Sequence, residues 1–508
     1  MSRSFWILVF TGLCISGCAS DSLKLAPQQA DKPWKPQKDE NGRIQPGEAE
    51  TPSLSDRSFT LPKDPSPVDL GPSLDIKPGH HYSLIELIDI AESNNPLTAM
   101  AWNTAREVAL AAGIARSAYL PRLTAAAVGG HQTYQVKLSA PALSANNGAQ
   151  GEGVITSLSL NWLLFDFGQR DALVEAADQA TVVANIGFNA VHQALIHDVS
   201  VAFYAHSAAQ SRVKLAGQSL KNATDVQAVA DERLNRGVGT VIETSKAEQA
   251  TAQAKLSLVQ AEGGAKNTYQ ALLNAMGVSP LTQLLTEDIS DRKFDPSMST
   301  RVNDIVSEAL AQRPDILAAY AEEKAAKAVS EAAEADFLPK VFVSGTGAYS
   351  NGGLYLTQIP SIGNQSSIGN FGNSGFGGTV FGGITMALYD GGTRQAILGQ
   401  TRAKAEKAAL NLTQKRNLAV KEIVTAQNTL ETGVSTYDAA SKMVKASEIT
   451  FDGALTAYKN GVGSITEVLI SEIQLLQAKI AITEAHSATL AAAATLALAT
   501  GSMDSVQK

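Results

Sequence analysis

Hydrophobic and small residues recur every three to four positions over two long stretches without proline, residues 169–236 and 393–460. This is the period of one face of an α-helix. At a rise of 1.5 Å per residue, each stretch predicts a helix of roughly 100 Å. Helices of this length are typical of coiled coils and helical barrels. The recurring positions in the first stretch are mostly small, which favours close packing of helices: Leu173, Ala176, Ala177, Ala180, Val183 and Ala184.

The period changes to two between Pro121 and Asp166, and again between Pro339 and Asp390. The alternating positions are Leu158, Leu160 and Trp162 against Ser157, Ser159 and Asn161, and Val380, Ile384, Met386 and Leu388 against Thr379, Phe381, Thr385 and Ala387. Apolar side chains outward and polar ones inward is the pattern of transmembrane barrel strands. Two such segments predict four strands per chain. Four strands cannot close, and an open edge in lipid leaves backbone groups unpaired, so we expect other copies to complete the sheet.

The two halves of the chain repeat one order: helix, two strands, long helix, turn, helix. Residues 96–121 and 314–339 both run from one proline to the next Leu-Pro, and LLFDFGQR at 163–170 matches ALYDGGTR at 387–394. The offset between the copies is 218 residues before the strands and 224 after them. The constant offset indicates an internal duplication. Six additional residues lie among the second pair of strands, which we predict to be a loop insertion.

Each long helix is predicted to end at nearly the same phrase, GVGTVIE at 237–243 and GVGSITE at 461–467. Glycine just past a helix enters the left-handed region freely and commonly ends it. The Thr or Ser that follows, with Glu three residues later, forms the capping-box pattern, in which hydroxyl and carboxylate each accept a backbone N–H. Each phrase therefore predicts a tight turn between two helices. The predicted turn residues are Gly237, Gly239, Thr240 and Glu243, and Gly461, Gly463, Ser464 and Glu467.

The N-terminus predicts export and a lipid anchor. Residues 1–17 carry one cation, Arg3, and then an apolar run too short to span a bilayer, as in a signal peptide. The run ends in Ile-Ser-Gly-Cys, which resembles the bacterial lipobox, so we expect Cys18 to become the lipidated (palmitate-bearing) first residue. Ala19 rather than Asp follows, which favours the outer membrane. With Cys14 removed, no internal disulfide is expected. The alternative is an ordinary signal peptide with a chance cysteine.

Residues 18–82 hold ten of the chain's 18 prolines, a composition that excludes a helix and a substantial core. We predict an extended, lipid-anchored arm over this segment. The predicted organisation is a signal peptide at 1–17, the arm at 18–82, a first repeat at 83–293 and a second repeat at 294–508.

Composition and charge exclude several classes of function. The chain is 44% hydrophobic, 18% charged and 6% aromatic, its net charge is −8, and no run of Lys or Arg points to nucleic acid. No stretch after the signal is long and apolar enough for a membrane helix, so any crossing must use strands. No phosphate-binding GxxxxGK[ST] or nucleophile-elbow GxSxG pattern is present. His192 and His197 are about 140° apart around a helix. We expect no enzyme activity, no cofactor and no metal site.

Together these features resemble the TolC-type outer-membrane efflux channels, especially the lipid-anchored OprM- and NodT-like members. The resemblance covers about residues 83–501 and depends on the duplicated Leu-Pro, the LFDFGQR and LYDGGTR junctions, and the turns RLNRGVGTVIE and AYKNGVGSITE. It implies a mixed α/β membrane protein, a homotrimer whose chains each give four strands to a 12-stranded outer-membrane β-barrel. A long periplasmic α-helical barrel continues from it. With two turns in each of three chains, the trimer then has six hairpins at its closed periplasmic end.

The resemblance also implies roles for residues at this end. In the family, acids just after the turns narrow the entrance, and a Tyr and an Arg help to hold it closed. Glu467 and Tyr458 match such positions, and Glu243 matches the acid of the first hairpin. A ring of carboxylates would favour cations at the mouth. The alternative is that Glu243 and Glu467 only cap their helices.

Two departures from the family pattern affect the closing contacts. Gly463 stands where the family has the Arg, and Ile470 stands where it has a second acid. How the mouth is held closed is therefore open, and Arg236 or Lys459 is a candidate for the missing cation.

The implied function is the passive outer-membrane channel of a tripartite efflux system. A periplasmic adaptor and an inner-membrane pump would deliver small toxic compounds or drugs to it, and the lipid-anchored relatives favour a proton-driven pump over an ABC transporter. One alternative is the channel of a type I protein secretion system, which shares the fold. A second alternative is a lipid-anchored periplasmic coiled coil without a pore.

Overall fold

The computed structural model describes residues 76–140, 143–289, 302–352, 356–359, 367–371 and 375–503, with residues 26, 37–38, 44–45 and 61 before them. The chain divides into two units, Met1–Ser73 and Leu74–Lys508. In the first unit, β1 (Gln37–Lys38) pairs antiparallel with β2 (Ile44–Gln45). The predicted signal peptide and Cys18 lie outside the described residues.

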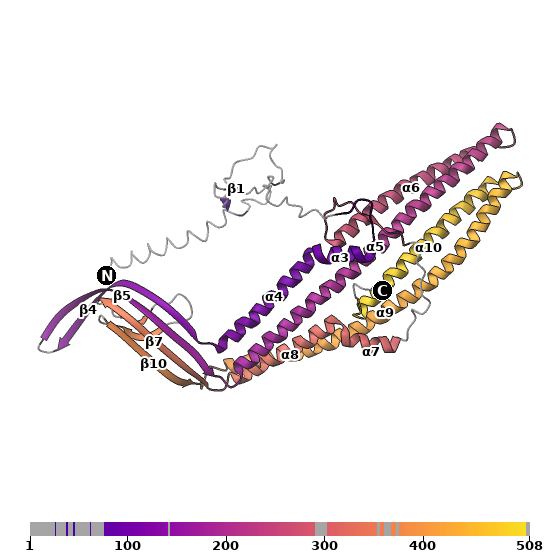
Figure 1. Ribbon diagram of the computed structural model, residues 1–508. Coiled ribbons are helices and arrows are strands. Elements are labelled where there is room, and N and C mark those ends of the chain that lie inside the picture. Colours follow the sequence, from indigo (N-terminus) through magenta and orange to yellow (C-terminus); the bar gives the residue numbers. More distant parts are fainter. Residues whose placement is uncertain are drawn as a thin grey trace, which may run out of the picture. The chain divides into compact units, whose positions relative to one another are not determined.

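The second unit contains one order of elements twice (Figure 1). The first copy comprises α3 (Leu84–Asn94), α4 (Pro96–Arg116), the 3-10 turn η3 (Ser117–Tyr119), β4 (Arg122–Ala140), β5 (Leu143–Phe165), α5 (Gln169–Asn235) and α6 (Val241–Met276). The second comprises α7 (Val302–Gln312), α8 (Pro314–Ala335), β7 (Lys340–Gly352), β8 (Leu356–Ile359), β9 (Ser367–Phe371), β10 (Gly375–Thr385), α9 (Thr393–Lys459) and α10 (Ile465–Ala499). The short strands β3 (His81–Tyr82) and β6 (Leu285–Thr286) pair in parallel. The two long helices end within one residue of their predicted bounds.

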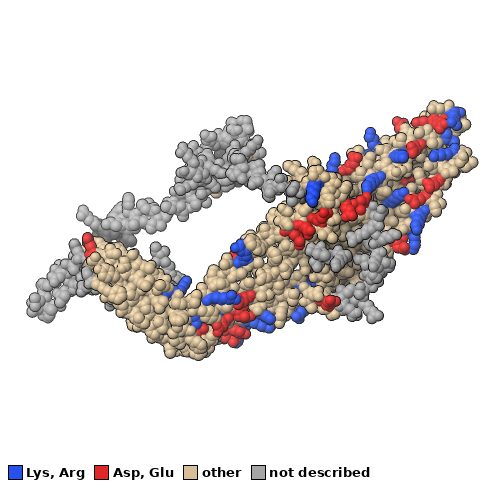
Figure 2. Space-filling view, in the orientation of Figure 1, with Lys and Arg blue, Asp and Glu red and all other residues tan. Residues whose placement is uncertain are grey.

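Four strands form one antiparallel sheet in the order β10-β7-β5-β4. β4 pairs with β5 along the whole length of β4, and β4 and β10 are the edges of the sheet. Ser157 and Ser159 of β5 are buried, whereas Leu158 and Trp162 are exposed, as the alternation predicts. The alternation fails at Asn161, which is exposed like Trp162. On the face shown in Figure 2, the described part of the sheet has hardly any charged side chains, and Lys, Arg, Asp and Glu gather over the helices.

The region between Pro339 and Asp390, in which six additional residues were predicted to form a loop insertion, is different. It contains β8 and β9, which pair antiparallel, so the prediction of a loop was wrong there. Strands of four and five residues are too short for alternation to be recognised among so many Gly, Asn and Ser residues. β10 ends at Thr385, so Met386 and Leu388 lie beyond the strand whose apolar face they were predicted to share. The sequence reading also missed α3 and α7.

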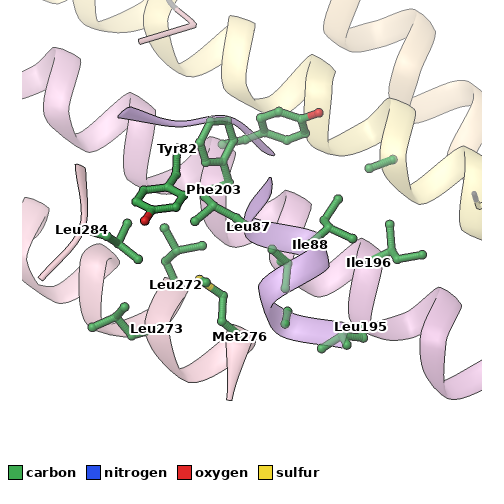
Figure 3. Packing of buried hydrophobic residues seen from close by; sticks show 14 of the residues in the cluster. Tyr82, Leu87, Ile88, Leu195, Ile196, Phe203, Leu272, Leu273, Met276 and Leu284 are labelled. Atoms are coloured by element: carbon green, nitrogen blue, oxygen red, sulfur yellow. The ribbon is translucent and has the colours of Figure 1, made fainter. Parts of the chain in front are cut away.

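A core cluster fixes the base of the first hairpin, which is formed by α5 and α6 (Figure 3). Tyr82 and the helix α3 pack there against both helices of the hairpin, and Leu87, Phe203, Leu272, Leu273 and Met276 are at most 1% exposed. Within the described residues, no helix combines the length and the apolar character needed to cross a membrane.

Both strand–helix junctions contain an Asp–Arg pair four residues apart. In the first copy, Nε of Arg170 lies 2.9 Å from Oδ2 of Asp166, and the guanidinium donates to the carbonyl oxygens of Ala118, Leu163 and Leu164. Because this cation is nine-tenths buried, it ties the end of β5 and the turn η3 that follows α4 to the start of α5.

The second junction repeats this arrangement in a more exposed form. Nε of Arg394 lies 2.7 Å from Oδ2 of Asp390, and the guanidinium donates to the carbonyl oxygens of Ala387 and Asp336. The Asp390 side chain is 27% exposed.

Where helices of one copy meet end to end, the two copies use different side chains. Asn95 donates to the carbonyl oxygen of Ala275 at 3.1 Å, which joins the end of α6 to the start of α4. Arg313 donates to the carbonyl oxygen of Ala499 at 2.8 Å, which joins α10 to α8. Arg313 also pairs with Asp315 and Glu422 and, despite the cost of burial, their hydrogen bonds raise the pKa of Arg313.

Candidate functional site

Both predicted turns end their helices in the same way. Gly237 and Gly461 have φ of 74° and 78°, in the left-handed region. After each glycine, the valine N–H donates to the carbonyl oxygen five residues earlier, from Val238 to Arg233 and from Val462 to Ala457, each at 3.0 Å. The glycine N–H donates to the carbonyl oxygen three residues earlier. This is the Schellman motif, which satisfies the last carbonyl groups of a helix.

The second glycine of each turn lies against the preceding helix. A Cβ atom on Gly239 would be 2.8 Å from the backbone nitrogen of Leu234, and one on Gly463 would be 3.0 Å from that of Tyr458. Real Cβ contacts are rarely this short, so any side chain at either position requires the helix end to move. Gly463, where the family pattern has an Arg, is therefore a position of close backbone approach.

The turns form only half of the predicted capping box. The N–H of Glu243 donates to the hydroxyl of Thr240 at 3.3 Å, and that of Glu467 to the hydroxyl of Ser464 at 3.2 Å. Within the described residues, the reciprocal bond from the cap N–H to the carboxylate forms at Ser83 but at neither turn. The expectation that both Glu side chains reach back to the cap was wrong.

The carboxylate of Glu243 is directed instead to the second hairpin. The hydroxyl of Tyr458, in α9, donates to Oε2 of Glu243 at 3.4 Å. Nε of Arg233, in α5, lies 4.0 Å from the same oxygen. The Arg233 guanidinium also lies over the Tyr458 ring, 5.0 Å from its centroid, and Nη1 donates to the Tyr458 carbonyl oxygen at 3.4 Å. We call Arg233, Glu243 and Tyr458 the tip cluster.

The tip cluster is mostly shielded from water. Tyr458 is 1% exposed, and the side chains of Arg233 and Glu243 are 21% and 27% exposed. Burial and the negative charge of Glu243 raise the pKa of Tyr458, so its hydroxyl stays protonated and available as a donor at neutral pH. The cluster therefore joins the two hairpins of one chain by two hydrogen bonds and a cation–π contact, all made to Tyr458. The ion pair between Arg233 and Glu243 lies within the first hairpin and links α5 to α6.

Apolar packing continues from the tip cluster along both hairpins. Val226 and Ala230 of α5 pack with Phe451 of α9 and with Ile465 and Val468 of α10. Outside this packing, Nζ of Lys246 in α6 lies 3.2 Å from Oγ1 of Thr466 in α10. Side chains from four helices thus hold the two turns of one chain together.

Other predicted site residues lie apart from the cluster. Arg236 pairs with Glu232 of its own helix, and both side chains are more than half exposed. Lys459 and Glu467 are exposed, and Ile470 is 52% exposed. The structure thus brings Tyr458 and Glu243 together, and the suggested roles of Arg236, Lys459 and Glu467 stay predictions.

Sequence reasoning missed Arg233. It stands three residues before Arg236 in the same phrase, one helical turn away, and this spacing was the available signal. The position 224 residues later is Ala457, so the repeat contains no second copy of this arginine. Only the fold brings Arg233 to Tyr458, 225 residues further along the chain.

The site joins the helices of the two hairpins through side-chain contacts. Within the described ranges, no group of three or more His, Cys, Asp or Glu side chains is placed to hold a metal ion. The contacts at the turns are ones that a small relative movement of the two hairpins would break.

Comparisons with known proteins agree with this architecture. The family model described as outer membrane efflux protein matches residues 87–278 and 305–502. Protein CyaE of Bordetella pertussis is 24% identical over 402 residues, which are 78% of this chain and 79% of that protein. The cation efflux system protein CusC of Escherichia coli is 25% identical over 326 residues, 63% of this chain and 66% of CusC. The crystal structure of the Campylobacter jejuni CmeC outer membrane channel has a TM-score of 0.70 at 17% identity, with 84% of this chain and 87% of that chain covered.

Proposed function

The chain belongs to the outer membrane efflux protein family, and we propose that three copies of it form a passive duct whose mouth is built from the paired turns. The chain is an outer-membrane channel component of an efflux system, and its helices extend into the periplasm. Our proposal concerns three further properties of the channel: its stoichiometry, the residues that control its mouth, and its partners.

The observation that carries the proposal is the open four-stranded sheet. β4 and β10 are the edges of this sheet. Because each of the three neighbouring pairs is antiparallel, β4 and β10 run in opposite directions. An edge β10 placed beside β4 of the next copy therefore continues the antiparallel alternation. Three copies give twelve strands without an edge, whereas a single chain in lipid leaves two edges unpaired, at several kcal/mol for each backbone group.

The surface of the sheet supports the same arrangement. Large apolar side chains are exposed on the strands: Leu123, Val154, Leu158, Trp162, Phe376, Val380 and Ile384. β4, β5 and β7 have 19, 23 and 13 residues and β10 has 11, so each is at least as long as the roughly 9–11 residues that a transmembrane β-strand needs. An exposed apolar surface of this kind is typical of strands that face lipid.

We propose that the tip cluster keeps the mouth narrow at rest. Arg233, Glu243 and Tyr458 join the two hairpins of each chain, so an iris-like opening must break contacts that are individually weak. Glu467, exposed beyond the second turn, would add a carboxylate at the mouth and favour cations there.

The proposed partners are a periplasmic adaptor at the turns, an inner-membrane pump, for which we favour a proton-driven type, and lipid attached to Cys18. The proposed cargo is small toxic compounds or drugs. The relative CusC is named for cation efflux, which fits carboxylates at the mouth. Susceptibility of a deletion strain to a panel of metal ions and drugs would identify the cargo. Loss of export of a single protein, with unchanged tolerance, would favour the secretion channel instead.

Conductance tests the channel itself. The purified full-length protein should migrate as a trimer without heating and as a monomer after heating. It should also give discrete current steps in a planar lipid bilayer. A monomer that produces no steps would contradict the proposal and would favour the coiled coil without a pore.

A further inference from the structure

A buried acid lies in the contact between the two hairpins, away from the tip cluster. Glu472 is in α10, about 10 Å along the helix from its first residue, Ile465. Ile465, Val468 and Leu475 are buried at the same three- to four-residue spacing, and Glu472 is only 6% exposed. A carboxyl group thus occupies a position on the packed face where an apolar side chain is the rule. We call this packed α5–α10 contact the hairpin seam.

The bonding partner of Glu472 belongs to the other hairpin. The hydroxyl of Ser219, in α5, donates to Oε1 of Glu472 at 3.0 Å, across 253 residues of sequence. The two groups lie beside a cavity of about 20 Å³, which is also lined by Gln218 and Asn222 of α5. A cavity of this size holds about one water molecule.

Charged groups near Glu472 are already paired. On its own helix, Lys479 lines the same cavity but forms an ion pair at 2.9 Å with Glu448 of α9. Further along the seam, Arg212 of α5 pairs with Glu484 of α10, and both side chains are about half exposed. The groups that α5 presents beside Ser219 are the uncharged Gln218 and Asn222. Burial therefore raises the pKa of Glu472, and the Ser219 hydrogen bond opposes the rise only in part.

The sign of the pH effect follows from the two states of the seam. A packed seam binds the proton of Glu472 more tightly than a separated seam, in which water surrounds the carboxyl group. Below the ordinary pKa of Glu the group is neutral in both states, and packing has no ionic cost. As pH rises through the raised pKa, the packed seam must hold a buried negative charge, so separation becomes more favourable.

We infer that Glu472 is a pH-dependent closing contact between the two hairpins, holding the seam packed as a neutral carboxyl group and loosening it when ionised. A channel of this kind would be more closed in an acidic periplasm. The closed-to-open ratio would change up to tenfold for each pH unit between the ordinary and the raised pKa. This inference rests on the proposed channel function.

The test is the conductance of the full-length trimer in planar bilayers at pH 5 and pH 8. The wild-type protein should conduct about threefold to tenfold more at pH 8, by the same linkage. Glu472→Gln, which keeps the shape and cannot ionise, should give nearly equal conductance at the two pH values. A wild-type conductance that does not change with pH, or a Glu472→Gln variant with the wild-type ratio, would overturn the inference.

Two further variants separate the titration from a structural role. Ser219→Ala removes the hydrogen bond that stabilises the ionised carboxylate, so it should move the conductance midpoint to higher pH. Glu484→Gln, in the same seam but exposed, is the matched control and should change the level of conductance without changing the ratio. A merely structural contact would not move the midpoint in either direction.

Hydrogen exchange gives a readout that does not need a pore. After correction for the intrinsic pH dependence, the amides of residues 465–485 should be less protected at pH 8 than at pH 5, and Glu472→Gln should remove the difference. Equal protection in the wild-type protein would contradict the inference. Absence of current at every pH, with the exchange difference present, would instead contradict the proposed channel.

Discussion

The two copies of the repeat share their backbone features and differ in the side chains that join them. Gly237 and Gly461 take the same left-handed conformation and complete the same Schellman bonds. Arg233 has no counterpart, since Ala457 stands 224 residues later. Features that one hairpin needs by itself are thus duplicated, whereas contacts between the hairpins exist once. The difference identifies the unduplicated side chains as those that join the two hairpins of one chain.

The largest loss of stability is expected from breaking the Asp–Arg pair at one of the two strand–helix junctions. Arg170→Ala leaves Asp166, which is 4% exposed, without its cation, and leaves three carbonyl oxygens without this donor. Breaking such a buried pair costs about 3–5 kcal/mol. Arg394→Ala should cost less, because Asp390 is partly solvated. Thermal dissociation of the proposed trimer, followed by gel migration, would compare the two variants. Equal losses would show that burial does not distinguish the two junctions.

The second-largest loss of stability is expected where two helices of one copy meet end to end, and the two copies use different side chains at these joints. Arg313→Ala removes a charged donor from Ala499 and from two carboxylates, which predicts a loss of about 2–3 kcal/mol. Asn95→Ala removes a helix cap as well as the bond to Ala275, which predicts about 1 kcal/mol. Unfolding followed by circular dichroism at 222 nm measures both. A larger loss for Asn95→Ala would reverse the comparison.

A smaller effect should be equal in the two copies. Gly237→Ala and Gly461→Ala each force a side chain into the left-handed region, which costs about 1–2 kcal/mol. Because the backbone is the same at both turns, the two losses of stability should agree within error. Hydrogen exchange at the helix ends gives the measurement. A marked difference would mean that the turns are not equivalent in the proposed trimer.

Local features of the sequence predicted the long helices, the turns and most of the sheet faces, but not α3 and α7. Proline, glycine and apolar period act within a few residues, so the bounds of α5 and α9 followed within one residue. Contacts between the copies could not be read in this way. Arg233 meets Tyr458, and Ser219 meets Glu472, across 225 and 253 residues, and nothing local marks either pair. The boundaries of the two repeats stay predictions.

The smallest expected effect is on the closing contacts themselves. Tyr458→Phe keeps the buried ring and its contact with Arg233 but removes the hydroxyl that donates to Glu243 at 3.4 Å. A hydrogen bond this long contributes less than about 1 kcal/mol, so single-channel conductance should rise by no more than about fivefold. Arg233→Ala should raise conductance further, because it removes the ion pair, the cation–π contact and the bond to the Tyr458 carbonyl oxygen.

Glu467→Ala completes the comparison at the second turn. Its carboxylate is exposed and outside the tip cluster, so its loss should raise conductance and reduce cation preference without loosening the hairpins. Unchanged conductance and selectivity would leave Glu467 with only the cap contact of its N–H to Ser464. Suppose instead that Glu467→Ala changed the conductance while Tyr458→Phe and Arg233→Ala left it unchanged. Charge at the rim of the mouth would then control the conductance. The unduplicated contacts between the hairpins would then stabilise the fold without controlling flow.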